Sequence, residues 1–392
     1  MRLFFSLDKI YVMKKIYLDN AATTPILDEV IDAMMLVMKT NFGNPSSTHS
    51  LGQEAKMILE ENRRLIAQEL HVSPAEIIFT SCGTEANNLI IKSAVENLGV
   101  KRIITTEIEH KCVYETTLDV QQKSDLEVVY LHVNEKGDID LQELETALKS
   151  SDKVTLVSLM HANNEIGNLL DLEKTAKICK ENKAYFHSDT VQTMAHLKLD
   201  FSQIPIDFAS CSAHKFHGPK GAGFAFIRKT THLKAQIHGG TQERSLRAGT
   251  ENVVGIAGLG KAFDISVEKM SEFSVYIQEI KDYAIEQLTT NIPGVLFNGR
   301  SAEKEKSLYT LLSISLPSMN PLIGLQLDMK GIAVSQGSAC SSGAAKPSSV
   351  LSKILSEEVQ QITTPLRISF SHQTTKQDID ELVMALKDIL KL

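Results

Sequence analysis

Five groups of polar residues follow predicted β-strands in this chain, and their chemical types suit a single pocket. The groups are Ser81-Cys82-Gly83-Thr84-Glu85, Glu109-His110-Lys111, His161-Ala162-Asn163-Asn164-Glu165, Asp189, and His214-Lys215. Open α/β sheets bind ligands beyond the carboxyl ends of their strands, so these groups should meet at one edge of a sheet. A Gly-Thr turn, a histidine, an asparagine, an aspartate and a lysine would then line one site.

The Gly83-Thr84 turn, placed at the start of a predicted helix, offers backbone N–H groups and a hydroxyl that suit a phosphate. Ordinary helix capping would explain the same two residues. No Walker motif is present, and no G-x-G-x-x-G follows a predicted strand, which disfavours a nucleotide.

Asp189 and Lys215 end successive predicted strands. An aspartate there can cap a loop, and a lysine is most often a surface residue. Next to a phosphate turn, however, the two match the needs of pyridoxal phosphate. That cofactor takes a lysine amine as its covalent anchor and a carboxylate that keeps its pyridine nitrogen protonated.

The elements that must position these residues follow an α/β pattern. Short β-rich runs alternate with amphipathic helical stretches, which predicts a large, mostly parallel sheet flanked by helices. The predicted strands cover residues 76–80, 102–105, 126–131, 154–159, 184–188, 208–212 and 223–227. Pro25 after Thr24 predicts the start of the first helix.

The character of the sequence changes near residue 265, where a long charged helix over 267–288 begins. A strand over 310–316 and a final amphipathic helix follow. We therefore predict a large domain over residues 24–265. Residues 1–23 and 266–392 form a smaller α+β domain, which carries a mobile loop at about 335–346.

Composition excludes several functional classes. The 392 residues are 43% hydrophobic and 23% charged, as in ordinary globular proteins. The net charge of −7 and the lack of a basic block argue against direct nucleic-acid binding. No apolar run is long enough to span a membrane. Five scattered cysteines without a C-x-x-C pair predict neither disulfides nor a metal site, and indicate a reducing cytoplasm.

Several motifs resemble those of one enzyme family. They are Tyr17-Leu18-Asp19-Asn20-Ala21-Ala22-Thr23-Thr24-Pro25, Phe42-Gly43-Asn44-Pro45-Ser46-Ser47, Phe79-Thr80-Ser81, Asn163-Asn164-Glu165-Ile166-Gly167, Ser212-Ala213-His214-Lys215, Arg247-Ala248-Gly249-Thr250 and Gly337-Ser338-Ala339-Cys340. In this order they resemble the NifS/IscS-type cysteine desulfurases, which are fold-type I pyridoxal-phosphate enzymes of the class V aminotransferase group.

The resemblance implies a set of cofactor-binding residues, namely Gly83, Thr84, His110, Asn164, Asp189, Gln192, Ser212, His214, Lys215 and Thr250. Lys215 matches the covalent anchor, and Asp189 matches the partner of the pyridine nitrogen. His110 matches the histidine that stacks on the ring and transfers protons. Gln192 matches the donor to the phenolic oxygen. Thr250 would reach the phosphate from the neighbouring subunit, which implies a homodimer.

The resemblance also implies how substrate and sulfur are handled. Asn164 and Arg367 match the residues that hold the substrate carboxylate. Cys340 lies in a stretch of small residues, as expected of a mobile thiol nucleophile and sulfur carrier. Cys179 and Cys211 fit buried positions instead. Cys82 stands where the family usually has glycine or alanine.

The activity implied is conversion of L-cysteine to L-alanine, with the sulfur left as a persulfide on Cys340. The catalytic residues would be Lys215, Cys340 and His110. The sulfur would pass to an acceptor protein, such as an iron-sulfur scaffold or a tRNA thiolation enzyme. A selenocysteine lyase, another aminotransferase-like enzyme and a catalytically silent sulfur-transfer scaffold remain alternatives. Selenide release and alanine formation distinguish them.

Overall fold

Short apolar segments form the central sheet of the computed structural model, which describes residues 15–336 and 348–392. In spatial order the seven strands of this sheet within those ranges are β2 (Ile77–Thr80), β8 (Gly223–Ile227), β7 (Phe208–Ser212), β6 (Tyr185–Asp189), β5 (Thr155–Ser158), β3 (Arg102–Thr105) and β4 (Glu127–Tyr130). Neighbours from β7 to β4 pair in parallel, whereas β8 is antiparallel to both β2 and β7. Most of these strands are buried along their full length, which explains their continuous apolar sequences.

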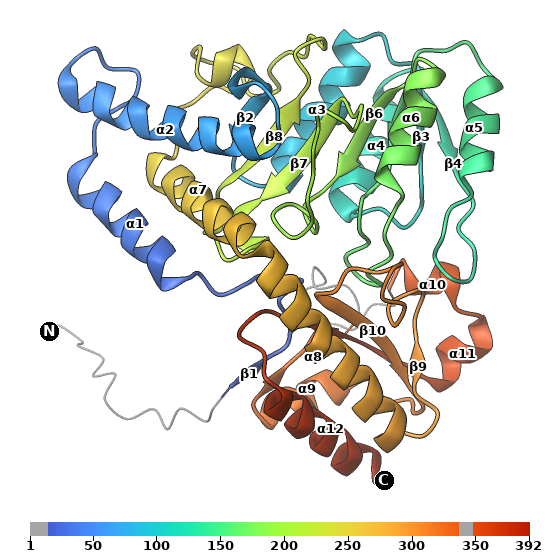
Figure 1. Cartoon of the computed structure of the whole chain (residues 1–392). Coiled ribbons are helices and arrows are strands. Elements are labelled where there is room, and N and C mark those ends of the chain that lie inside the picture. Colours follow the sequence, from blue (N-terminus) through green and yellow to red (C-terminus); the bar gives the residue numbers. More distant parts are fainter. Residues whose placement is uncertain (1–14, 337–347) are drawn as a thin grey trace, which may run out of the picture.

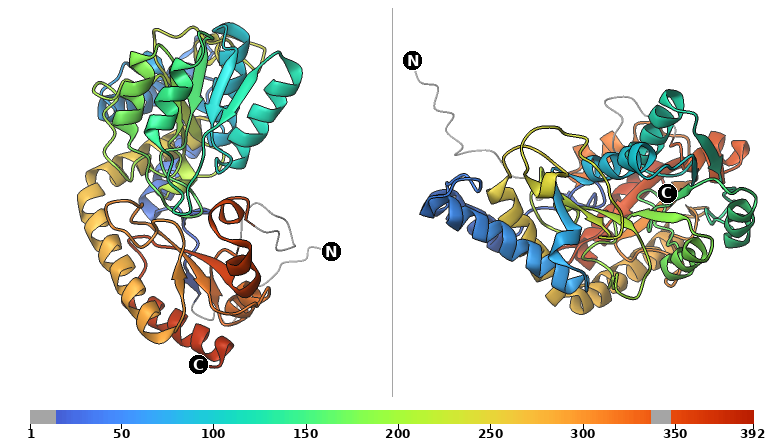
Figure 2. Two further views of the ribbon diagram at one scale, coloured as in Figure 1. Left: turned by 90° about the vertical axis from the view of Figure 1, so that its right-hand side faces the viewer. Right: turned by 90° about the horizontal axis from the view of Figure 1, so that it is seen from above.

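Helices cover both faces of the sheet (Figures 1 and 2). One face packs against α3 (Gly83–Asn97) and α4 (Lys111–Lys123). The other face packs against α2 (Ser50–Glu69), α5 (Leu141–Lys149), α6 (Leu172–Glu181) and α7 (Val253–Glu268). The predicted α/β class, with its mostly parallel sheet between helices, is confirmed.

A second hydrophobic cluster lies in the smaller region at the bottom of Figure 1. Its three-stranded antiparallel sheet has the order β12 (Thr364–Ser369), β10 (Leu311–Leu316) and β9 (Leu296–Phe297). The helices of this region are α8 (Met270–Asn291), α9 (Ile323–Met329), α10 (Leu351–Ile354), α11 (Glu357–Ile362) and α12 (Lys376–Leu390). Strand β1 (Ile16–Tyr17), the first among the described residues, pairs in parallel with β11 (Ile332–Ala333). The domain boundaries themselves stay a prediction.

Two helix starts differ from expectation. The first helix, α1 (Asp28–Thr40), begins three residues after Pro25. Thr24 does not cap it, because its hydroxyl donates to His214 O and accepts from His217 N. The helix predicted over 267–288 begins at Met270, since Glu268 ends α7 and Lys269 separates the two helices.

Within the part of the chain that the structure describes, no helix is both long enough and apolar enough to cross a membrane.

Candidate active site

A cavity of about 310 Å³ lies at the carboxyl ends of the parallel strands. Its walls include segments that follow β2, β3, β5, β6 and β7, together with Arg367 of β12. The predicted site residues that line it are Gly83, Thr84, His110, Asn164, Asp189, Gln192, Ser212, His214, Lys215 and Arg367. The fold therefore gathers residues that are up to 284 positions apart, from Gly83 to Arg367.

One end of this cavity is suited to a phosphate. Helix α3 begins there at Gly83, and the N–H groups of a first helical turn have no partner within the helix. A Cβ on Gly83 would lie 2.4 Å from Val191 Cγ2, so only glycine fits. Ser212 Oγ and His214 Nδ1 are buried without a hydrogen-bond partner among the described residues. Such unpaired donors are costly unless a ligand satisfies them.

His214 is uncharged at neutral pH. Burial, together with the nearby cations Lys215 and Lys220, lowers its pKa to about 4. A neutral imidazole still carries one N–H group that can donate to an anion.

Asp189, the last residue of β6, is held by neutral donors. Its Oδ2 accepts from Asn87 Nδ2 at 2.8 Å, and its Oδ1 accepts from Val191 N at 3.0 Å and Ser210 Oγ at 3.3 Å. These donors are neutral groups, and a carboxylate held in this way is the partner that a protonated pyridine nitrogen requires.

Asn87 is itself fixed by a chain of buried groups. Its Oδ1 lies 3.0 Å from His187 Nε2, and His187 Nδ1 lies 2.8 Å from Ser158 Oγ. Burial lowers the pKa of His187 to about 4, so this ring is neutral and adds no charge beside Asp189. The sequence analysis did not identify Asn87, although it lies one helical turn from Gly83 on α3.

Lys215 enters the cavity from the short helix η2 (Ala213–Lys215). Its Nζ donates to Ala21 O at 2.6 Å and to Ala22 O at 3.0 Å. Gln192 Nε2 donates to the same Ala21 O at 3.1 Å. The segment that follows β1 thus positions two predicted cofactor-binding residues of the large sheet.

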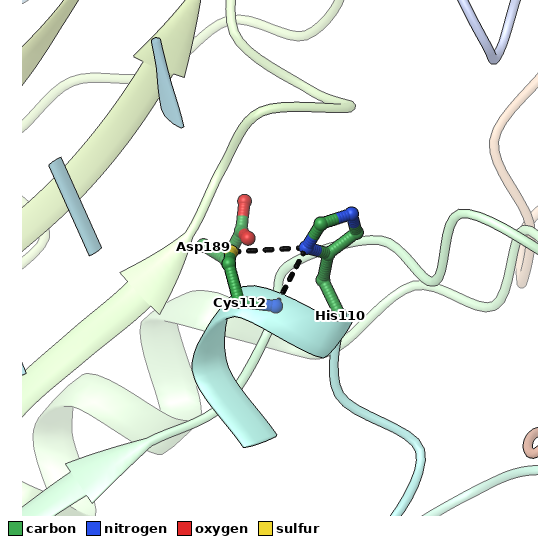
Figure 3. Close-up of side chains that lie close together, drawn as sticks. All are labelled: His110, Cys112 and Asp189. Carbon is green, nitrogen blue, oxygen red and sulfur yellow. Dashed lines mark hydrogen bonds between the residues drawn. The ribbon is translucent and has the colours of Figure 1, made fainter. Parts of the chain in front are cut away.

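His110 is the N-cap residue of α4. Its Nδ1 accepts from Cys112 N at 3.1 Å and lies 2.9 Å from Cys112 Sγ. Figure 3 shows the two side chains together with Asp189, next to one another at the cavity wall. Cys112 is a further thiol at this site that the sequence analysis did not single out.

Comparisons with known proteins agree with this geometry. The model of the family described as "Aminotransferase class-V" matches residues 16–382. The chain belongs to this family. It is 40% identical over 381 residues to the cysteine desulfurase IscS of Dictyoglomus turgidum, covering 96% of this chain and 95% of that protein. The solved structure of a NifS-like protein superposes with a TM-score of 0.87 at 37% identity, covering 96% and 99% of the two chains. A structure described as SspA in complex with cysteine has a TM-score of 0.77 at 31% identity, covering 90% and 98%.

Arg367 is buried at the opposite side of the cavity. Its Nη1 donates to Asn164 O at 2.8 Å, and its Nη2 pairs with Asp19 Oδ1 at 2.9 Å and donates to Ser335 Oγ at 3.0 Å. Within the described residues its Nε has no partner. The contact with Asn164 uses the backbone, so the Asn164 side chain is not held by this arginine.

Glu109 is a buried acid that the sequence analysis placed in the pocket without a role. Its Oε1 accepts from Thr106 Oγ1 and Met160 N, both at 3.1 Å. Burial raises the pKa of Glu109 to about 8, and the charge of Asp189 acts in the same direction. The Glu109 carboxyl is therefore mostly protonated at neutral pH.

One predicted site residue among the described residues does not line the cavity. Thr250 is exposed just before α7, and the single chain does not bring it to Gly83. Cys340 lies outside the described residues. Cys179 and Cys211 are buried, as predicted.

Proposed function

We propose that the chain is a pyridoxal-phosphate-dependent cysteine desulfurase. It would convert L-cysteine and an enzyme thiol into L-alanine and an enzyme persulfide. The observation that carries the proposal is the placement of Lys215 and Asp189 in one cavity with the open N-terminus of α3. The names of relatives that act on cysteine support the choice of substrate.

The residues present fit the cofactor. The first turn of α3, Ser212 and His214 would hold its phosphate, and Asp189 its pyridine nitrogen. Lys215 would bind it covalently, and His110 would pack on its ring. When bound, pyridoxal phosphate supplies an electron sink that stabilises negative charge at the substrate Cα.

The chain's own residues would carry out the remaining steps. The Arg367 fork orients the substrate carboxylate, and the Lys215 amine removes the Cα proton. The Cys340 thiolate then attacks the substrate sulfur, so that an S–S bond forms while the C–S bond breaks. The carbon that loses sulfur takes up a proton and becomes the methyl group of alanine. Atoms balance, because the enzyme thiol gains the sulfur that cysteine loses.

The test uses the purified full chain. We expect a yellow protein that bleaches with borohydride and forms alanine from L-cysteine. Lys215→Ala should lose turnover by at least roughly a thousandfold, because one amine serves as both anchor and base. Lys220→Ala, an exposed lysine five residues away, is the matched control. A colourless protein that makes no alanine would contradict the proposal and favour a silent scaffold. Faster turnover of selenocysteine than of cysteine would favour a lyase.

We also propose that the enzyme acts as a homodimer. Apolar side chains are exposed along α1 and just beyond it, with Leu36 62% and Phe42 75% accessible. Such a patch is typical of an interface. A second copy would cover it and could bring its Thr250 to this chain's phosphate site. Leu36→Asp with Phe42→Asp should yield monomers with weakened cofactor binding, whereas Met384→Asp, 69% accessible on α12, should not. A monomeric, fully active wild type in sedimentation analysis would contradict this.

The remaining proposals rest on the sequence. A sulfur-acceptor protein would receive the persulfide, and the lack of a disulfide pattern supports a reducing cytoplasm.

A further inference from the structure

Three potential metal ligands meet at the cavity wall. One ligand atom from each of His110, Cys112 and Asp189 lies within 4.8 Å of the others. Figure 3 draws these three side chains. His110 Nδ1 and Cys112 Sγ lie 2.9 Å apart. Bond lengths of about 2.0–2.3 Å place the ligands of a tetrahedral zinc ion roughly 3–4 Å apart. Small rotations of these side chains would therefore be enough to enclose a cation.

The surrounding side chains hold this cluster in place. Asn87 Nδ2 donates to Asp189 Oδ2 at 2.8 Å and to Cys112 Sγ at 3.2 Å. Val191 N and Ser210 Oγ fix the other oxygen of the carboxylate. Hydrogen-bond partners of this kind orient first-shell ligands in metal sites and strengthen metal binding.

The chemistry of the three ligands selects the cation. A thiolate and a carboxylate together balance a charge of two, and an imidazole nitrogen with a sulfur disfavours Mg²⁺ and Ca²⁺. Lys215, a cationic side chain that lines the same cavity, donates to the carbonyls of Ala21 and Ala22. A fourth coordination position would face the cavity and take a water molecule.

We propose that His110, Cys112 and Asp189 bind Zn²⁺ or a similar soft divalent cation, in competition with the cofactor. On binding, the Cys112 S–H bond breaks, its proton passes to solvent, and a sulfur–metal bond forms without any change of oxidation state. The hydrogen bond from Cys112 N to His110 Nδ1 is replaced by a nitrogen–metal bond. The competition rests on the proposed function, because Asp189 and His110 cannot serve a metal and a cofactor ring together.

The experiment uses the full chain after removal of the cofactor. Co²⁺ should produce a thiolate-to-cobalt charge-transfer band, and Zn²⁺ should displace it. Cys112→Ser should abolish the band and weaken zinc binding, measured by calorimetry, by roughly a hundredfold. Cys82→Ser is the matched control, since Cys82 lines the same cavity outside the cluster. It should bind both metals like the wild type. Asp189→Asn is a second variant, which should keep the band while weakening zinc binding.

Two results would overturn parts of the inference separately. Unchanged zinc affinity and cobalt band in folded Cys112→Ser would refute the metal site. An equal cobalt band in holoenzyme and cofactor-free protein would refute the competition. The cobalt band needs no desulfurase activity, so a protein that binds the metal but never forms alanine would contradict only the proposed function.

Discussion

The two walls of the cavity treat charge in opposite ways. On the side of the large sheet, Asp189 receives hydrogen bonds from neutral groups, those of Asn87, Val191 and Ser210. On the side of the smaller region, Arg367 already pairs with a carboxylate, that of Asp19, at 2.9 Å. The first wall thus offers a carboxylate held by neutral hydrogen-bond donors to a cationic ligand. The second offers an arginine that an incoming carboxylate must share.

Removal of the charge of Asp189 should have the largest effect on activity. Asp189→Asn keeps the shape of the side chain but removes the anion, so the pyridine nitrogen loses its charged partner. We expect alanine formation to fall by about 100- to 1000-fold. Bound cofactor should dissociate more easily, as seen by absorbance after dialysis. Activity within a few fold of the wild type would mean that alanine formation does not depend on the negative charge of Asp189.

On the same wall, Glu109 should be protonated and neutral, so that of these two acids only Asp189 carries a negative charge. The pKa of Glu109 is about 8 in the folded chain, well above the ordinary value of 4.5. Between these values Glu109 therefore holds a proton in the folded state that it lacks in the unfolded state, so the contribution of this group to the free energy of unfolding falls as pH rises from about 5 to 8. The slope for one such group is at most about 1.4 kcal/mol per pH unit.

Glu109→Gln should remove that slope. Denaturant titrations at several pH values would measure it. Glu107→Gln provides the control, since Glu107 is exposed and pairs with Lys353. Equal pH slopes in the wild type and Glu109→Gln would show that Glu109 is already ionised in the folded protein.

Asn87 is one of the neutral donors to Asp189, and its replacement measures how much that hydrogen bond contributes to cofactor affinity. Asn87→Ala removes one donor to Oδ2, which should cost about 1–2 kcal/mol, or roughly tenfold, in cofactor affinity. Asn88→Ala is the matched control, because Asn88 donates to Thr84 O within its own helix. A cofactor titration of stripped protein gives both values. Equal losses in the two variants would point to a general effect on α3.

Replacement of Asp19, on the opposite wall, should have the smallest effect on the kinetics. Asp19→Asn removes the carboxylate that competes for Arg367, so KM for L-cysteine should fall by up to about fivefold with kcat little changed. Asp138→Asn, in the Arg300 pair at 2.8 Å, is a comparable change away from the cavity. A raised KM would instead show that Asp19 positions Arg367 for the substrate.

The sequence predicted the sheet well because its strands are continuous apolar runs bounded by polar turns. The residues at the strand ends were equally visible, since the carboxyl edge of a parallel sheet is a general place for a site. Asn87 and Glu109 were not given roles, because burial and distant partners determine them: His187 lies 100 positions from Asn87. The predicted start of α1 was wrong for a similar reason, because the Thr24 hydroxyl hydrogen-bonds to the backbone of His214 and His217.

The metal cluster illustrates a different difficulty. A histidine and a cysteine separated by one residue resemble no common ligand spacing, and Asp189 is 77 positions further along. The sequence analysis expected no metal site on the grounds of cysteine spacing alone. Folding, not spacing, brings the third ligand to α4. The proposed role of Thr250 would likewise depend on a second chain, which no pattern within one chain can place.

The pairing of β1 has a consequence for synthesis on the ribosome. Ile16 pairs with Ile332, and Asp19 forms an isolated β-bridge with Ser369. Strand β1 and the residues after it therefore cannot form these pairs until their distant partners have been synthesised. The carbonyls of Ala21 and Ala22, which hold the Lys215 amine, follow directly on that strand. Contacts this distant in sequence form late in folding. A nascent chain that has completed the large sheet would still lack the pocket around its lysine, and cofactor loading would have to wait until Ile332 and Ser369 have joined it.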